Sequence, residues 1–179
     1  LIEEIRQVDH AVEGLAGAAG ERGSGGMSSK LAAAKMASWS GVRTVIAAAD
    51  RPGIVQDAIG AAPGVGTTVF ARDAHVSARK LWIGFAVTTE GTIVVDEGAK
   101  RALLERGRSL LAAGVADVEG SFAVGDAVEI VGADRVVFAK GLTGLDSAAL
   151  HEAKGKRTED LLPGAAGPVV HADDLVLLP

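Results

Sequence analysis

Cysteine and tyrosine are absent from this 179-residue sequence, and its aromatic residues are limited to two tryptophans and four phenylalanines. Without cysteine the chain cannot hold a disulfide framework, a thiol nucleophile, or a zinc or iron–sulfur site with cysteine ligands. Few aromatic rings are left to stack on nucleic-acid bases. The lack of cysteine also fits a reducing compartment, and we predict a cytoplasmic protein.

Long apolar runs are missing as well. The longest candidates, such as residues 42–49, are the size of a strand, far below the roughly 20 residues that span a bilayer. The first residues have neither a basic start nor the apolar core of a signal peptide, and the chain does not begin with methionine. We therefore predict a soluble piece of a longer protein that has no membrane partner.

Acidic residues outnumber basic ones in the second half of the chain. Residues 1–72 carry seven basic and seven acidic side chains, so the formal net charge of −5 comes entirely from residues 73–179. Affinity for nucleic acid depends largely on Lys and Arg contacts to phosphates. This half has one cluster of basic residues, formed by Lys154, Lys156 and Arg157. The cluster could contact RNA, or it could be a solvated turn after the C-terminus of a helix, where cations are favoured. We do not expect RNA as a partner.

Residues 1–72 have the pattern of an α/β region, because helical periodicity alternates with short apolar runs. The expected elements are a helix at 27–40, a strand at 42–49, a helix at 54–59 and a strand at 67–71. Ser28 or Ser29 could cap the first helix, and the continuous apolar run suits a strand covered on both faces. The alternation predicts a mostly parallel sheet.

Residues 91–179 contain short strand patterns separated by glycine-containing turns. The expected strands lie at 92–96, 115–118, 127–131, 136–142, 169–171 and 175–178, and the expected helices at 97–107 and 147–153. In the first of these helices Ala99, Leu103 and Leu104 form an apolar stripe, and Gly107 ends it. The pattern predicts a small β-barrel. Residues 73–90, between the two regions, are predicted to be a linker.

The strongest chemical signal is the run Gly23-Ser24-Gly25-Gly26-Met27-Ser28-Ser29-Lys30. Glycines let backbone N–H groups approach a phosphate closely, and the start of a helix adds free donors and partial positive charge. A lysine in the first turn can reach a phosphate as a point charge. The two common phosphate fingerprints do not fit, because Ser29 and Ser28 stand where each requires glycine. A flexible loop with a solvated lysine is the alternative that these residues leave open.

A series of short segments resembles, in the same order, the C-terminal half of the bacterial glutamate 5-kinase family. Each segment is weak alone, and the combination covers nearly all of the chain. The segments are Gly23–Leu31, Pro52-Gly53, Gly66–Phe70, Arg79–Ile83, Glu97–Ala99, Arg106–Leu111, Gly114-Val115, Glu119–Phe122, Gly125-Asp126 and His171–Asp174.

The resemblance implies a fold and an activity. Residues 1–72 would be the last part of an amino-acid-kinase domain, an αβα sandwich, and residues 91–179 a PUA domain, a small pseudo-barrel. The family uses ATP and Mg²⁺ to phosphorylate the side-chain carboxylate of L-glutamate, which opens proline biosynthesis. It also implies L-glutamate and ATP as binding partners and a homo-oligomer, dimer or tetramer.

The resemblance also implies a set of site residues. Gly23, Ser24, Gly25, Gly26, Met27 and Lys30 match the family's ATP-binding loop, and Lys30 matches its phosphate-contacting lysine. Ser24 replaces the usual threonine and keeps the hydroxyl, and the lead-in at 20–22 is short. The family's N-terminal catalytic lysine and its glutamate-binding Asp-Asn segment have no counterpart here. We therefore expect no catalytic residue in this chain and no activity from it alone, since phosphoryl transfer needs nucleophile, metal and charge neutralisation together.

The histidines and the adjacent aspartates Asp173 and Asp174 do not have the spacing of a metal site or of an acid–base pair. No pair among the four histidines has metal-ligand spacing, and we predict no protein metal site. Asp173 and Asp174 are adjacent, so on a strand they point to opposite faces and do not form an acid–base pair. The alternative function is a non-catalytic PUA binding module that binds RNA or regulates the kinase.

Overall fold

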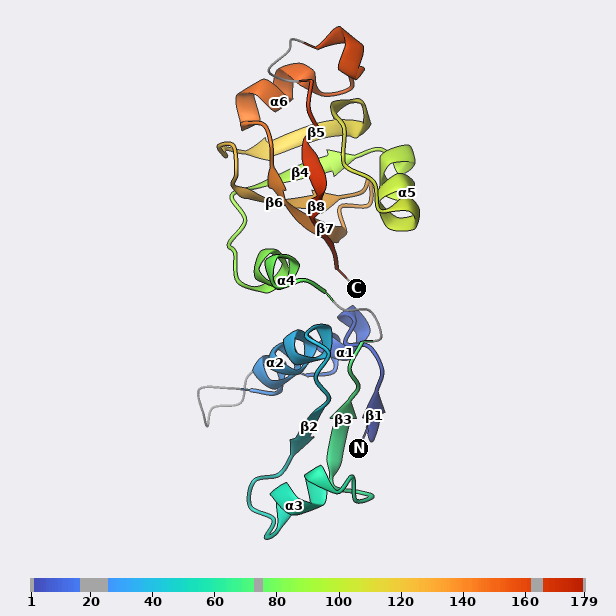
Figure 1. The fold of residues 1–179 in the computed structure, drawn as a ribbon, viewed down its shortest axis with the longest axis vertical. Coiled ribbons are helices and arrows are strands. Elements are labelled where there is room, and N and C mark those ends of the chain that lie inside the picture. Colours follow the sequence, from blue (N-terminus) through green and yellow to red (C-terminus); the bar gives the residue numbers. More distant parts are fainter. Residues whose placement is uncertain (1, 17–25, 73–75, 162–165, 179) are drawn as a thin grey trace. The chain divides into compact units, whose positions relative to one another are not determined.

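The computed structural model describes residues 2–16, 26–72, 76–161 and 166–178 (Figure 1). The chain divides into two compact units, residues 1–78 and residues 79–178. Helix α4 (Ala78–Phe85) lies within the predicted linker and, from Arg79 on, belongs to the second unit. No helix in these described ranges is long and apolar enough to cross a membrane.

The first unit is a three-stranded sheet with helices. Its elements are β1 (Glu4–Ile5), α1 (His10–Gly14), α2 (Met27–Trp39), β2 (Thr44–Ala47), α3 (Ile54–Ile59) and β3 (Gly66–Val69). The helices predicted at 27–40 and 54–59 are confirmed. Leu31 and Ala34 of α2 pack with Ile5, Val8 and Val69 to form the core of this unit.

The sheet has the order β1-β3-β2, and its pairing corrects the expected direction of the strands. Only β1 runs parallel to β3, whereas β2 is antiparallel to it. The expectation of a mostly parallel sheet is therefore wrong. The connecting helix α3 has six residues, which at 1.5 Å per residue is about 9 Å. It stays at the ends of the two strands that it connects instead of running back along them (Figure 1).

Strand β2 also differs from its predicted environment. It is four residues long, and each of its side chains is only half-buried. The expectation of a strand covered on both faces is therefore wrong in this structure. Backbone contact with β3 is close, since a Cβ on Gly66 would lie 2.2 Å from the carbonyl oxygen of Ile46. This approach requires glycine at position 66.

The second unit is a five-stranded sheet with the order β5-β4-β6-β7-β8. Only β4 and β6 are parallel. Besides α4, its elements are β4 (Gly91–Val95), α5 (Glu97–Arg106), a 3-10 turn η1 (Ala112–Gly114), β5 (Val115–Gly120), β6 (Ala127–Val131), β7 (Val137–Thr143), α6 (Ser147–Ala153), a 3-10 turn η2 (Thr158–Asp160) and β8 (Val170–Leu177).

The two predicted helices of this unit are confirmed, and a side chain caps the start of each. Asp96 accepts a hydrogen bond from the Ala99 N–H at 2.7 Å, and Gly107 ends α5 with φ of 55°. Asp146 caps α6 in the same way, at 2.8 Å from the Ala149 nitrogen. The apolar stripe is wrong at one position, because Leu104 is 46% exposed.

The last strand is continuous, whereas the sequence predicts two strands at 169–171 and 175–178. Thr143 of β7 pairs with Val170, and Gly141 pairs with Leu175, so residues 171–174 bulge out of the ladder. A Cβ on Gly141 would lie 2.4 Å from Val170 Cγ1. The polar bulge interrupts the alternating pattern and hides the continuity of the strand.

Candidate functional site

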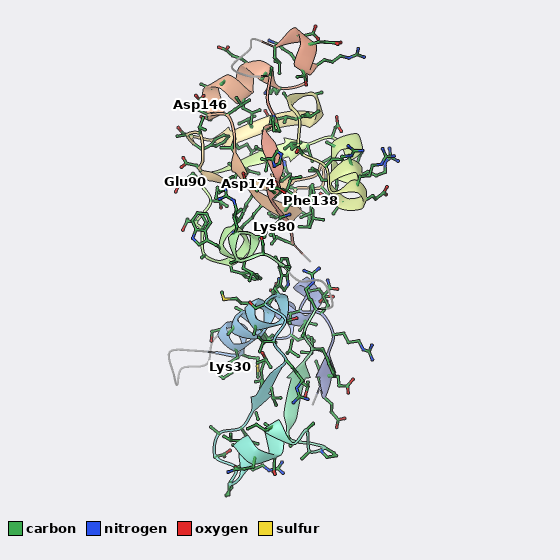
Figure 2. All side chains as sticks on the ribbon, viewed as in Figure 1. Lys30, Lys80, Glu90, Phe138, Asp146 and Asp174 are labelled. Atoms are coloured by element: carbon green, nitrogen blue, oxygen red, sulfur yellow. The ribbon has the colours of Figure 1, made fainter. Side chains whose placement is uncertain are left out.

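The predicted phosphate-binding residues lie at the N-terminus of α2. Gly26 is the N-cap, and the helix begins at Met27. Lys30 lies in the first turn with an exposed side chain (Figure 2). Gly23, Ser24 and Gly25 lie outside the described residues. The structure therefore places three of the six predicted residues at one helix terminus.

The first turn of α2 has backbone N–H groups of the kind that bind anions. Gly26 is extended, with φ of −67° and ψ of −174°, and no side chain of the described residues caps the helix. The Ser29 hydroxyl instead donates to the Gly26 carbonyl at 2.8 Å. The predicted cap at Ser28 or Ser29 is wrong, because α2 starts before both serines. No acidic side chain lies in the first turn, so the helix dipole is available to an anion.

The opposite face of α2 is anchored to the rest of the first unit. Lys35 is buried, and its Nζ lies 2.8 Å from Oε1 of Glu13 in α1. Ser38 donates its hydroxyl to the Phe70 carbonyl at 2.7 Å. Because Lys30 and Lys35 are five residues apart, they lie on different sides of the helix. The pair of Lys35 with Glu13 was not predicted from the sequence. The signal that could have indicated it is the position of Lys35 on the same side of the helix as the buried residues Leu31, Ala34 and Ser38.

The described residues contain no group of three or more His, Asp or Glu side chains placed to hold a metal ion. The features that would suit MgATP here are the open helix N-terminus and the Lys30 ammonium.

In the second unit three of the family-like segments meet at the bulge of β8. Arg79 of α4 forms an ion pair with Asp174, and Lys80 donates to the Ala172 carbonyl at 3.0 Å (Figure 2). The Ala172 N–H donates to the Ser109 hydroxyl oxygen at 3.0 Å. We call Arg79, Lys80, Ser109 and residues 171–174 the bulge cluster. Its contacts satisfy backbone groups that leave the strand ladder.

Asp173 and Asp174, the adjacent acidic residues of this bulge, differ in exposure, as expected for neighbours that point to opposite faces of a strand. The side chain of Asp174 is 26% exposed and that of Asp173 is 87% exposed. His171 Nδ1 lies 3.4 Å from Asp173. The hydrogen bond to Asp174 raises the pKa of the Arg79 guanidinium above its ordinary value. These contacts indicate a structural role for the bulge cluster.

Two of the three cations in the basic cluster at the end of α6 pair with carboxylates. Lys154 Nζ lies 2.8 Å from Asp117 of β5, and Arg157 lies 3.6 Å from Glu159. The hydrogen bond from Lys154, with one from the Val118 N–H, lowers the pKa of the Asp117 carboxyl. These pairs reduce the positive charge that the cluster offers to a phosphate.

The second unit also contains a groove of about 610 Å³ between α5 and residues 108–114. Its walls are mostly apolar, with Leu103 and Leu111 among them, and Asp96 and Arg108 are its charged lining residues. The helix and the wall come close at Gly114, where a Cβ would lie 2.5 Å from the Ala99 Cβ.

Comparisons with known proteins give a consistent result. Residues 91–163 match the family model of the PUA domain. The chain is 42% identical over 179 residues to a glutamate 5-kinase of Rhodococcus jostii (strain RHA1). The aligned region covers 99% of this chain and 48% of the relative. It is 41% identical to that of Nocardia farcinica (strain IFM 10152), over 98% and 47% of the two chains. It is 37% identical to that of Dictyoglomus turgidum (strain DSM 6724 / Z-1310), over 99% and 48%.

Among solved structures, a PUA domain from Aeropyrum pernix K1 in complex with tartrate has 32% sequence identity and a TM-score of 0.39, covering 52% of this chain and 47% of that one. The sequence matches confirm the predicted resemblance to the C-terminal half of glutamate 5-kinases, and they confirm an α/β region followed by a PUA domain. The chain spans about half the length of the curated relatives it matches.

Proposed function

We propose that this chain, which matches the C-terminal half of glutamate 5-kinases over 99% of its length, is the corresponding part of an ATP:L-glutamate 5-phosphotransferase. That enzyme forms γ-glutamyl phosphate, the first step of proline biosynthesis. The observation that carries the proposal is sequence identity near 40% along nearly the whole chain. The predicted homo-oligomer and cytoplasmic location are part of the same proposal.

Within that enzyme the chain supplies part of the ATP-phosphate site. Backbone N–H groups at the start of α2 would donate to phosphate oxygens, and the Lys30 ammonium would neutralise charge on them. Bound MgATP supplies the phosphoryl group and the metal's charge. Gly23, Ser24, Gly25, Gly26 and Met27 match the family's ATP-binding loop, and glycines at such positions would leave room for the phosphates.

Titration of the 179-residue chain with MgATP tests this site. We expect Lys30→Ala to weaken binding at least about tenfold, because a hydrogen bond to a charged group contributes roughly 1.5–3 kcal/mol. Lys156→Ala, which removes an exposed lysine from the second unit, is the matched control and should bind as the wild type does. Equal affinity in the wild type and Lys30→Ala would remove Lys30 from the site.

Activity needs a separate measurement. Glutamate-dependent ADP release should be absent from a preparation whose intact mass is that of this chain alone. The reason is that this chain contributes residues that would contact the ATP phosphates and lacks counterparts of the family's catalytic lysine and glutamate-binding segment. Release of ADP by a preparation of 18.1 kDa would contradict the proposal that catalysis needs residues outside this chain.

The second candidate is a PUA binding module, and the groove beside α5 is the observation that favours it. It has less support than the kinase proposal, because two of the three cations in the basic cluster, Lys154 and Arg157, pair with carboxylates. RNA retention at low salt that is lost on Arg108→Ala would favour this candidate.

A further inference from the structure

Two buried polar contacts hold the second half of α2 in the first unit. Lys35 Nζ lies 2.8 Å from Oε1 of Glu13 in α1, and the Ser38 hydroxyl donates to the Phe70 carbonyl oxygen at 2.7 Å. Lys35 is 9% exposed and Ser38 is 4% exposed. The two contacts are therefore similar in burial, and they differ in what they connect.

The difference lies in the part of the chain that each contact encloses. Glu13 precedes the glycine-rich run at 23–30 in the sequence and Lys35 follows it, so their ion pair closes a stretch of chain that contains the whole run. Ser38 and Phe70 both follow the run, and their contact encloses β2 and α3 instead. Of these two contacts, only the ion pair connects α2 to the helix that precedes the run.

Helix α1 depends on contacts with α2 for its place in the unit. It has five residues, whereas an isolated helix shorter than about 12 residues is marginal in water. Val12 of α1 packs against the core cluster that contains Leu31 and Ala34 of α2. Its neighbour Glu13 forms the ion pair with Lys35. These contacts place α1 against α2.

A charged pair at this position suits the fixing of one helix against another. Helix α2 has alanine at positions 32, 33, 34 and 37, and such small side chains project little from the helix surface. A buried ion pair adds little stability over an apolar pair of similar volume, but its hydrogen bond has a defined geometry. Lys35 and Glu13 therefore favour one register of α2 against α1.

The start of α2 follows the position of the rest of the helix. Lys30 is five residues before Lys35, which is about 7.5 Å along the helix axis. No side chain of the described residues caps the helix at Gly26. A shift of α2 would therefore carry the Lys30 ammonium and the first-turn N–H groups with it, and small misplacements of groups that hold a substrate are costly.

We propose that Lys35 and Glu13 are positioning residues for the phosphate site at the start of α2. Their ion pair holds α2 in one register against α1, and in this way it sets where Lys30 and the first-turn N–H groups stand when MgATP binds. The proposal rests on the proposed function, because it takes Lys30 as a phosphate contact.

Titration of the 179-residue chain with MgATP tests the proposal through Lys35→Met. Methionine keeps an unbranched buried side chain, and the Glu13 side chain is 37% exposed, so water can solvate its carboxylate once the partner is gone. We expect Lys35→Met to weaken MgATP binding about three- to tenfold. Glu13→Gln should also weaken it. The fluorescence of buried Trp39, in a Trp82→Phe background, checks that the first unit of each variant is folded.

Ser38→Ala is the matched control. It removes a contact of similar burial on the same helix and leaves the Phe70 carbonyl without that hydrogen bond, so it should lower the stability of the first unit. Because this contact does not enclose the glycine-rich run, MgATP affinity should stay at the wild-type value.

A double-mutant cycle separates positioning from a general loss of structure. Lys30→Ala should weaken MgATP binding by a smaller factor in the Lys35→Met background than in the wild type, because a displaced Lys30 has already lost part of its contact. A role of Lys35 that does not involve Lys30 would leave that factor the same in both backgrounds and would contradict the proposal.

Two further results would overturn the proposal while the proposed function stands. One is unchanged MgATP affinity in Lys35→Met while Lys30→Ala still weakens binding. The other is an equal loss of affinity in Lys35→Met and Ser38→Ala, since any loosening of α2 would then have the same effect. If Lys30→Ala itself binds MgATP as the wild type does, the phosphate site of the proposed function is contradicted and the positioning role is overturned with it.

Discussion

Lys35 is a buried lysine whose ammonium group meets a carboxylate. Its side chain is 11% exposed and its Nζ lies 2.8 Å from Glu13 Oε1, whose side chain is 37% exposed. A buried charge is costly unless it is paired and hydrogen-bonded. The pair joins α1 to α2 and so connects the two helices that flank the glycine-rich segment.

We expect Glu13→Gln to lower the free energy of unfolding of the first unit by about 1–3 kcal/mol, since it leaves the buried ammonium without its countercharge. Asp57→Asn is the control, because Asp57 pairs with Arg51 at 3.0 Å in an exposed position, and exposed pairs contribute about 0–1 kcal/mol. Urea unfolding followed by Trp39 fluorescence in a Trp82→Phe background measures both. Equal losses for the two variants would show that burial of Lys35 is unimportant.

An ion pair links the C-terminal end of helix α6 to strand β5. Lys154, the residue that follows α6, lies 2.8 Å from Asp117 of β5. The hydrogen bond from Lys154 lowers the pKa of Asp117 in the folded state. Because that pKa is depressed, the unfolded chain takes up this proton first as the pH falls. The stabilisation is complete above the ordinary carboxyl pKa of about 4 and is lost as the pH drops through the lower folded value.

Stability of the second unit should therefore fall less steeply below about pH 4 in Asp117→Asn than in the wild type. At pH 7 the variant should be the less stable of the two, and the difference should shrink with acid. Urea midpoints at several pH values, followed by Trp82 fluorescence in a Trp39→Phe background, give the comparison. Asp160→Asn, at an exposed position, is the control. A difference that stays constant with pH would contradict the linkage.

The molecule consists of two units with separate cores. Helix α4 determines the N-terminal boundary of the second unit. The PUA family match starts at residue 91, whereas the second unit starts at Arg79. Arg79 and Lys80 bind the bulge of β8, and a Cβ on Gly84 would lie 3.5 Å from Val176 Cγ1. Helix α4 therefore packs against β8, the last strand of the second unit's sheet.

A fragment of residues 79–178 should be more thermally stable than one of residues 91–178. The shorter fragment loses the contacts of α4 and leaves Ala172 and Asp174 without their cationic partners. For a domain of this size each kcal/mol lost lowers Tm by about 4–8 °C, and we expect a drop of at least this size. Thermal unfolding followed by circular dichroism measures it. Equal Tm values would show that α4 is not part of the unit.

Local chemistry allowed much of this molecule to be predicted from sequence. Gly107 ends α5 as predicted and Asp146 caps α6, because each acts on its own neighbours in the chain. Asp96, which the sequence pattern assigns to a strand, is instead the N-cap of α5. The glycine-rich run and Lys30 pointed to the start of α2 for the same reason. The order of short segments along the chain was sufficient to indicate a resemblance to the C-terminal half of glutamate 5-kinases, and the sequence matches confirm that resemblance.

Tertiary structure alone decided the features that depend on contacts between distant residues. The antiparallel direction of β2 depends on where α3 packs, and a strand pattern is the same in both directions. Lys35 pairs with a residue 22 positions away, and Arg79 with one 95 positions away. Such contacts have no local periodicity, so the buried ion pair and the bulge cluster became visible only when folding brought their members together.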